Sequence, residues 1–106
     1  MAWLLLVVAG FFEVGFALGL KLSQGFTRPW PVVGMVVSGA MSFSLLAWAM
    51  RGLPVGTAYA VWTGIGAAGT VAFGIVFLGE PAGLLRVGAI ALILAGVVVL
   101  RLTEVG

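Results

Sequence analysis

Four long apolar runs divide this sequence, and each is about as long as the ~20 residues that an α-helix needs to cross a membrane. They cover residues 2–20, 31–50, 55–78 and 84–100. Only 8% of the 106 residues are charged, whereas soluble domains carry about 25% charged residues. So few charges cannot cover a water-exposed surface. The sequence therefore predicts an all-α integral membrane protein, with residues 1–106 forming a single domain of four transmembrane helices.

The connections between the runs are short, so we expect neighbouring helices to be antiparallel in a four-helix bundle, with both termini on one side. Arg51 and Arg101 then lie on the side of the termini. Lys21, Arg28 and Arg86 lie on the other side. Because an excess of basic residues sets the orientation of a membrane protein, this near balance would allow insertion both ways round.

The chain lacks cysteine and histidine. This composition excludes disulfides, thiol catalysis and the usual zinc sites, and we expect no cofactor and no metal. Without His, Cys or a Lys inside a span, the sequence offers no convincing nucleophile and base, so we expect no enzyme. It also has no basic cluster that would bind nucleic acid.

Glu13 lies near the middle of the first run. A carboxylate at mid-membrane costs at least a few kcal/mol, and such residues usually line a functional path. Its neighbours on the same helix face are Ala9, Gly10, Phe16 and Ala17, and three of these four are small enough to admit a helix or a ligand. The alternative is a structural Glu that is hydrogen-bonded to a hydroxyl and never ionised.

Apolar surroundings disfavour the charged form of a carboxyl. Such a group can bind a proton or a cation, but binding both at once is unfavourable. Competition at Glu13 would therefore be enough to exchange protons for a cation across the membrane.

Polar and aromatic partners for Glu13 are expected from the second and third runs. Tyr59 and Trp62 share a helix face; aromatic rings can hold a cation, and a phenol can hydrogen-bond a carboxylate. Simple core packing is the alternative for both. Ser42 could orient the carboxylate, or bond back to a carbonyl of its own helix.

Two sets of small residues have a possible structural role. The third run contains Gly64, Gly66 and Gly69. Glycines weaken a helix, so these residues predict either a hinge that opens the site to alternate sides or close helix packing. The fourth run contains Gly88, Ala89 and Gly96. Small residues at such spacings allow close helix approach, which favours a role in assembly.

One copy of so short a chain has little room for a site with gates on two sides. Many transporters obtain alternating access from inverted repeats, and this sequence has no internal repeat. An antiparallel homodimer would supply the missing repeat and bring two Glu13 carboxyls into one pocket, where they would titrate as a coupled pair.

Several motifs together resemble the small multidrug resistance family over the whole chain. They are Glu13, the loop Gly25-Phe-Thr-Arg28 and the segment Leu53-Pro-x-Gly-x-Ala-Tyr-Ala-x-Trp62. The stretch Trp62-Thr-Gly-Ile-Gly-Ala67 looks most like the guanidinium-exporter subtype.

This resemblance implies an antiparallel homodimer in the bacterial inner (plasma) membrane that exports guanidinium in exchange for protons. It implies that Gly10, Ser42, Tyr59 and Trp62 surround Glu13, that Ser42 and Trp62 brace the carboxylates, and that Tyr59 helps to close the site. The subtype usually has Trp where this sequence has Phe16. Phe lacks the indole N–H donor, so the substrate range is the property that this difference affects.

The leading hypothesis is thus a proton-coupled antiporter of guanidinium and small substituted guanidinium ions, whose planar donors fit carboxylates as an Arg side chain does. The first alternative is a broad exporter of quaternary ammonium and aromatic cations, which would depend on cation–π and apolar contacts. A non-transporting membrane scaffold or assembly subunit is an alternative of another class. A scaffold would account for the glycines but not for Glu13.

Overall fold

The computed structural model describes residues 2–103, which form four α-helices. Their bounds are Ala2–Leu22 for α1, Pro29–Ala49 for α2, Val55–Phe77 for α3 and Leu84–Thr103 for α4. Each helix is long and apolar enough to cross a membrane, which confirms the predicted all-α membrane class. The largest difference from the predicted runs is at the end of α4, which continues to Thr103.

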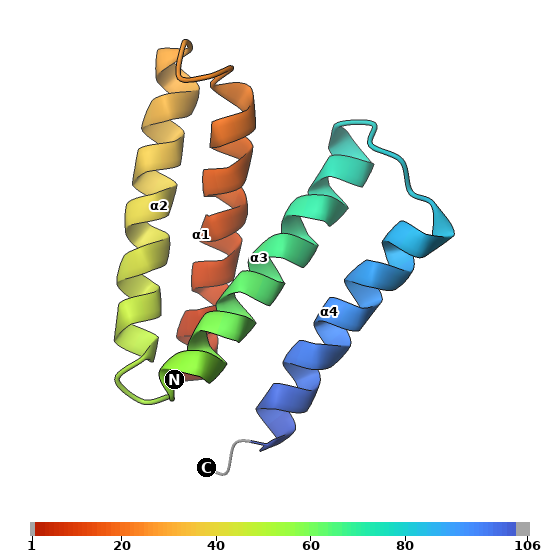
Figure 1. The fold of residues 1–106 in the computed structure, drawn as a ribbon. Helices are drawn as coiled ribbons and strands as arrows, with labels where there is room; N and C mark the ends of the chain where they lie inside the picture. The colour runs from red at the N-terminus through yellow and green to blue at the C-terminus, as the bar shows by residue number, and fades with distance from the viewer. Residues whose placement is uncertain (1, 104–106) are drawn as a thin grey trace.

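The helices lie in a layer, in the order α2, α1, α3, α4 (Figure 1). The chain reverses at every connection, so neighbouring helices in sequence are antiparallel, and the start of α1 and the end of α4 lie at the same end of the layer. The Cα atoms span 44 × 34 × 16 Å. α1 packs against both α2 and α3, whereas α4 packs against α3 and none of its described residues is buried.

The buried apolar core lies where α1, α2 and α3 meet, toward the end of the layer at which α1 starts and α4 ends. It is formed by Leu6, Ala9, Leu46, Ala49, Ala58, Val61 and Trp62. Several of these side chains are small, so the helices approach closely there. Most large apolar side chains outside this cluster are exposed on the layer's surface, as expected for a chain whose surroundings are lipid.

Gly19 sets the distance between α1 and α2 at the end of the layer away from this core. A Cβ atom at Gly19 would lie 2.8 Å from the Cβ of Met35 and 3.0 Å from its Cα and its backbone nitrogen. Real Cβ atoms essentially never lie within 3.0 Å of another atom, and the Met35 Cβ is bonded directly to the backbone of α2. An alanine at position 19 would therefore force the two helices to shift.

Side-chain hydrogen bonds fix the turn between α1 and α2. The buried Ser23 hydroxyl donates to the carbonyl of Leu20 (2.8 Å) and accepts the backbone N–H of Phe26 (3.2 Å). The Thr27 hydroxyl donates to the Ser23 carbonyl (3.2 Å). Phe26 has a positive φ of 68°, a conformation that costs roughly 1–2 kcal/mol in a residue other than glycine. This network holds the turn and directs the chain into α2.

Gly19→Ala is expected to destabilise the fold by about 1–3 kcal/mol, because overpacking at a rigid contact forces the backbone apart. Thermal unfolding in detergent measures the change. Gly34→Ala is the matched control, because Gly34 is on α2 with no neighbour within 4 Å. Equal unfolding midpoints for the two variants would contradict the role of Gly19.

Candidate functional site

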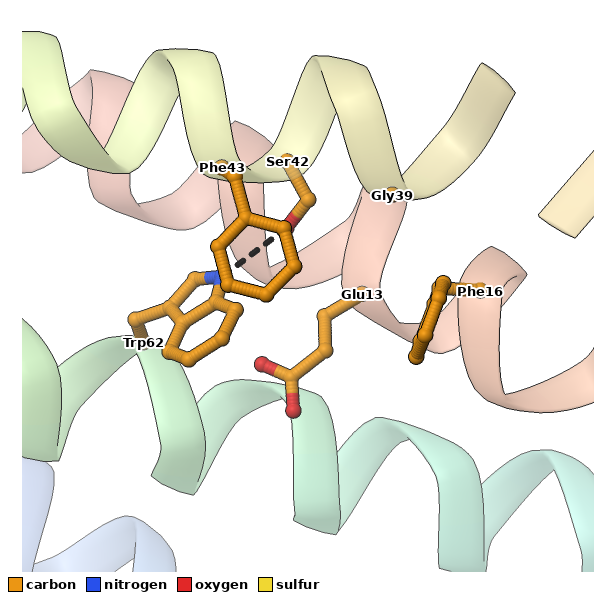
Figure 2. Close-up of a pocket in the computed structure, with 6 residues that line it drawn as sticks. All are labelled: Glu13, Phe16, Gly39, Ser42, Phe43 and Trp62. Atoms are coloured by element: carbon orange, nitrogen blue, oxygen red, sulfur yellow. Dashed lines mark hydrogen bonds between the residues drawn. The ribbon is translucent and has the colours of Figure 1, made fainter. Parts of the chain in front are cut away.

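A small cavity lies between α1, α2 and α3 at the position of Glu13 (Figure 2). Its volume is about 80 Å³. The residues that line it are Glu13, Phe16, Gly39, Ser42, Phe43 and Trp62. One carboxyl group therefore faces a cavity whose other walls are mostly aromatic rings and backbone.

Two hydrogen bonds join the three helices at one end of this cavity. The Ser42 hydroxyl donates to the carbonyl of Ala9 on α1 at 2.7 Å, and its oxygen accepts the Trp62 indole N–H at 2.8 Å. Ser42 thus bonds to a neighbouring helix and not to a carbonyl of its own helix. Since these bonds use the single hydroxyl proton of Ser42 and the single indole proton of Trp62, neither group donates to Glu13 in this arrangement.

The Glu13 carboxyl lies against the backbone of α3. A Cβ atom at Gly66 would lie 2.5 Å from the carboxyl carbon and 2.6 and 2.7 Å from its two oxygens. Glu13 Oε2 is buried and has no hydrogen-bond partner within residues 2–103. The arrangement leaves this oxygen available to a proton or to a ligand with N–H donors.

Of the residues expected around Glu13, the structure places Phe16, Ser42 and Trp62 at the cavity, whereas Gly10 and Tyr59 do not line it. Gly10 is buried against Ile65 of α3, in the contact between the two helices. The Tyr59 ring lies 5.5 Å from the Trp62 ring between centroids and is 55% exposed. Tyr59 therefore contacts the site through Trp62 and faces outward.

Sequence reasoning missed Gly39 and Phe43, both of which line the cavity. Gly39 precedes Ser42 by three residues, so helical spacing would have placed it on the Ser42 face. The Phe43 ring lies 5.2 Å from the Trp62 ring between centroids. Phe43 follows Gly39 by four residues, so helical spacing would have placed it beside Gly39.

The other two glycines of the predicted hinge are also close-packed. A Cβ at Gly64 would lie 2.8 Å from Val97 Cγ2 on α4, and one at Gly69 would lie 2.7 Å from Val14 Cγ2 on α1. The helix α3 runs without interruption through all three glycines. In this conformation the glycines bring α3 close to its two neighbours.

The two glycines Gly88 and Gly96 of α4 have no close neighbour among residues 2–103. Gly88 and Gly96 have no atom within 4 Å of the position of a Cβ. Gly96 and Ala89 are exposed, and Gly88 is half-buried. Close packing at these residues would thus require another molecule.

Within residues 2–103 there is no group of three or more His, Cys, Asp or Glu side chains that could hold an ion. The ion pair between Glu80 and Arg86, at 2.6 Å, lies in the connection between α3 and α4. Among the described residues Glu13 has no ion-pair partner, and it lies near the middle of α1.

Four helices long enough to span a membrane, three of which line a cavity with a single acidic group, are the features of a small membrane transporter that binds a cation. Residues 1–93 match the family described as Small Multidrug Resistance protein. The chain belongs to this family of multi-pass transporters of the bacterial inner membrane.

The relatives of the chain match it over nearly their whole length. A protein of Yersinia pseudotuberculosis named Guanidinium exporter is 57% identical over 98% of this chain and 100% of its own length. Proteins of the same name from Escherichia coli K12 and Citrobacter freundii are 53% and 50% identical, each over 97% of this chain and 98% of their own length.

Gly66→Ala is expected to destabilise the protein by about 1–3 kcal/mol, because its methyl group would overlap the Glu13 carboxyl. The same substitution made in a Glu13→Ala background should cost much less, since the overlapping group is gone. Thermal unfolding of the four proteins measures this coupling. Equal costs in both backgrounds would mean that the carboxyl is not held against Gly66.

Proposed function

We propose that this chain is a proton-coupled antiporter that exports guanidinium and small substituted guanidinium ions, with Glu13 as the shared binding site for proton and cation. The observation that carries the proposal is the buried, unpartnered Glu13 Oε2 in a cavity of about 80 Å³. The proposal involves no covalent chemistry, no cofactor and no metal.

The size of the cavity favours a small cation. Pockets for drug-sized ligands have volumes of about 300–1,000 Å³, whereas this cavity has about 80 Å³. A single water molecule needs about 10–15 Å³ on the same measure. The cavity thus has space for a small ion such as guanidinium and little for a drug-sized cation. The names of the three relatives support the same substrate.

The chemistry of the walls also suits a planar cation with several N–H donors. A guanidinium ion can donate two parallel hydrogen bonds to one carboxylate, which gives geometric specificity as well as energy. The rings of Phe16, Phe43 and Trp62 line the same cavity, and an aromatic face attracts a cation. Because Ser42 holds the Trp62 indole by a hydrogen bond, that wall keeps its orientation.

Exchange of protons for cations follows because both compete for the Glu13 carboxyl. A protonated Glu13 has no negative charge with which to bind a cation, and a bound cation disfavours protonation. Protons arriving from one side would release the cation, and the cation would release protons on the other. We propose that α3 bends at Gly64, Gly66 and Gly69 to expose the site to each side in turn.

We also propose that two copies form an antiparallel homodimer, in which α4 packs through Gly88, Ala89 and Gly96. Three observations support this proposal. No described residue of α4 is buried within one copy. The side chains of Phe43 and Tyr59, which flank Trp62, are each 55% exposed. The five basic residues divide almost evenly between the two ends of the layer.

Adding guanidinium to the purified protein in detergent is expected to release protons, and Glu13→Gln should abolish the release. Glu80→Gln is the matched control, because this carboxyl lies in the connection between α3 and α4. A pH-sensitive dye in weakly buffered solution measures the effect.

The same assay separates the alternatives. Release by tetraethylammonium but not by guanidinium would identify a broad multidrug exporter of this family. If folded protein released no protons with either ion, both exporter hypotheses would be wrong, and a membrane scaffold would be favoured.

Dual orientation can be tested with single introduced cysteines, since the chain has no cysteine of its own. Gly52→Cys and Gly83→Cys place one thiol at opposite ends of the layer. A membrane-impermeant maleimide applied to intact cells should label about half of each variant, because basic-residue balance sets the orientation. Full labelling of one variant and none of the other would rule out dual insertion.

A further inference from the structure

Gly39 on α2 and Phe16 on α1 are in unusually close contact. A Cβ atom at Gly39 would lie 2.8 Å from Cδ1 and 3.2 Å from Cε1 of the Phe16 ring. Gly39 is buried, so this contact lies inside the layer. The ring occupies the space that a side chain at position 39 would need. If position 39 carried even a methyl group, the ring could not keep its present place.

This contact forms one end of the Glu13 cavity (Figure 2). Ser42 bonds to Ala9, which precedes Glu13 by four residues on α1, whereas Phe16 follows Glu13 by three. The Ser42–Trp62 hydrogen bond therefore lies toward one end of the cavity and the Phe16 ring toward the other. The first end has hydrogen-bonding groups, while the Phe16–Gly39 end offers only a ring and a bare Cα.

We propose that Gly39 and Phe16 are a matched pair of specificity-determining residues that sets how large a substituent the bound guanidinium can carry. This inference rests on the proposed function, because it assigns the substrate range of the same site. The charged planar group binds to Glu13, and an apolar substituent extends toward Phe16. The position of the ring, fixed by the absence of a side chain at Gly39, limits the length of that substituent.

The two residues should have opposite effects on selectivity. Phe16→Leu replaces the rigid ring with a shorter, flexible side chain, so it should favour the larger of two guanidinium ions. Gly39→Ala adds a methyl group at the wall, which either enters the cavity or moves the ring. It should disfavour the larger ion. When Leu occupies position 16, its flexible side chain can make room for the methyl group.

The experiment is a double-mutant cycle on the full chain in detergent, with dissociation constants for guanidinium and phenylguanidinium from titration calorimetry. The measured quantity is the ratio of the two constants. Gly39→Ala is expected to weaken the binding of phenylguanidinium about tenfold relative to the binding of guanidinium, which is within the range of coupling between residues in contact. In the Phe16→Leu background the same change should alter the ratio by less than about twofold. Gly34→Ala, on the same helix with nothing within 4 Å, should leave the ratio unchanged.

The outcomes separate this inference from the proposed function. If the unmodified protein does not bind guanidinium, the proposed function is wrong, and this inference is wrong with it. If guanidinium binds but Gly39→Ala changes the ratio equally in both backgrounds, or not at all, only the matched pair is overturned. Should Gly39→Ala fail to fold, Phe16→Leu alone decides: a ratio that does not move toward phenylguanidinium contradicts the proposal.

Discussion

A carboxyl group in the middle of a membrane has no water to hydrogen-bond, and its charge is costly there. The surroundings of Glu13 are therefore the feature on which the site depends. α1 lies between α2 and α3, so the helix that carries the acid is covered on two sides. The Ser42 hydroxyl accepts a hydrogen bond from the Trp62 indole N–H and donates one to the carbonyl of Ala9, so these polar groups are paired. The Glu13 carboxyl is left to a ligand, since its buried Oε2 has no hydrogen-bond partner among residues 2–103.

The Glu13 site also depends on close approach between helices, which glycine residues allow. The carboxyl fits because Gly66 offers only backbone at that point, and Phe16 fits because Gly39 does. The hydrophobic effect does not drive helices together within lipid, so association depends on close van der Waals packing. The same glycines that bring α1 against α2 and α3 thus also shape the cavity, and packing and binding are not separate properties of this chain.

Hydropathy was sufficient to predict four helices, because membrane thickness fixes the length of a span. Glu13 was identifiable because it is the single acid inside the runs. The roles of Gly66 and Gly39 were not predictable, since they depend on the rotation and offset of one helix against another. For the same reason the sequence suggested Ser42 as a partner of Glu13, whereas its hydroxyl donates to Ala9 on the neighbouring helix. Single-helix spacing contains no information about contacts between helices.

In this single layer, the dimer contact proposed for α4 and the cavity at Glu13 lie on different helices. α4 packs against α3. Its cation–π contact with α1, in which the Arg101 guanidinium lies 5.1 Å from the Trp3 ring centroid, is ten residues before Glu13 on that helix. Changes on the outer face of α4 would therefore not reach the Glu13 cavity through direct contact. The cavity in turn is walled by residues of α1, α2 and α3 alone. α3 is the link, since one of its glycines packs against α4 and two pack against α1. Any bending of α3 must therefore alter both contacts together, which would couple the proposed dimer contact on α4 to the environment of the carboxyl.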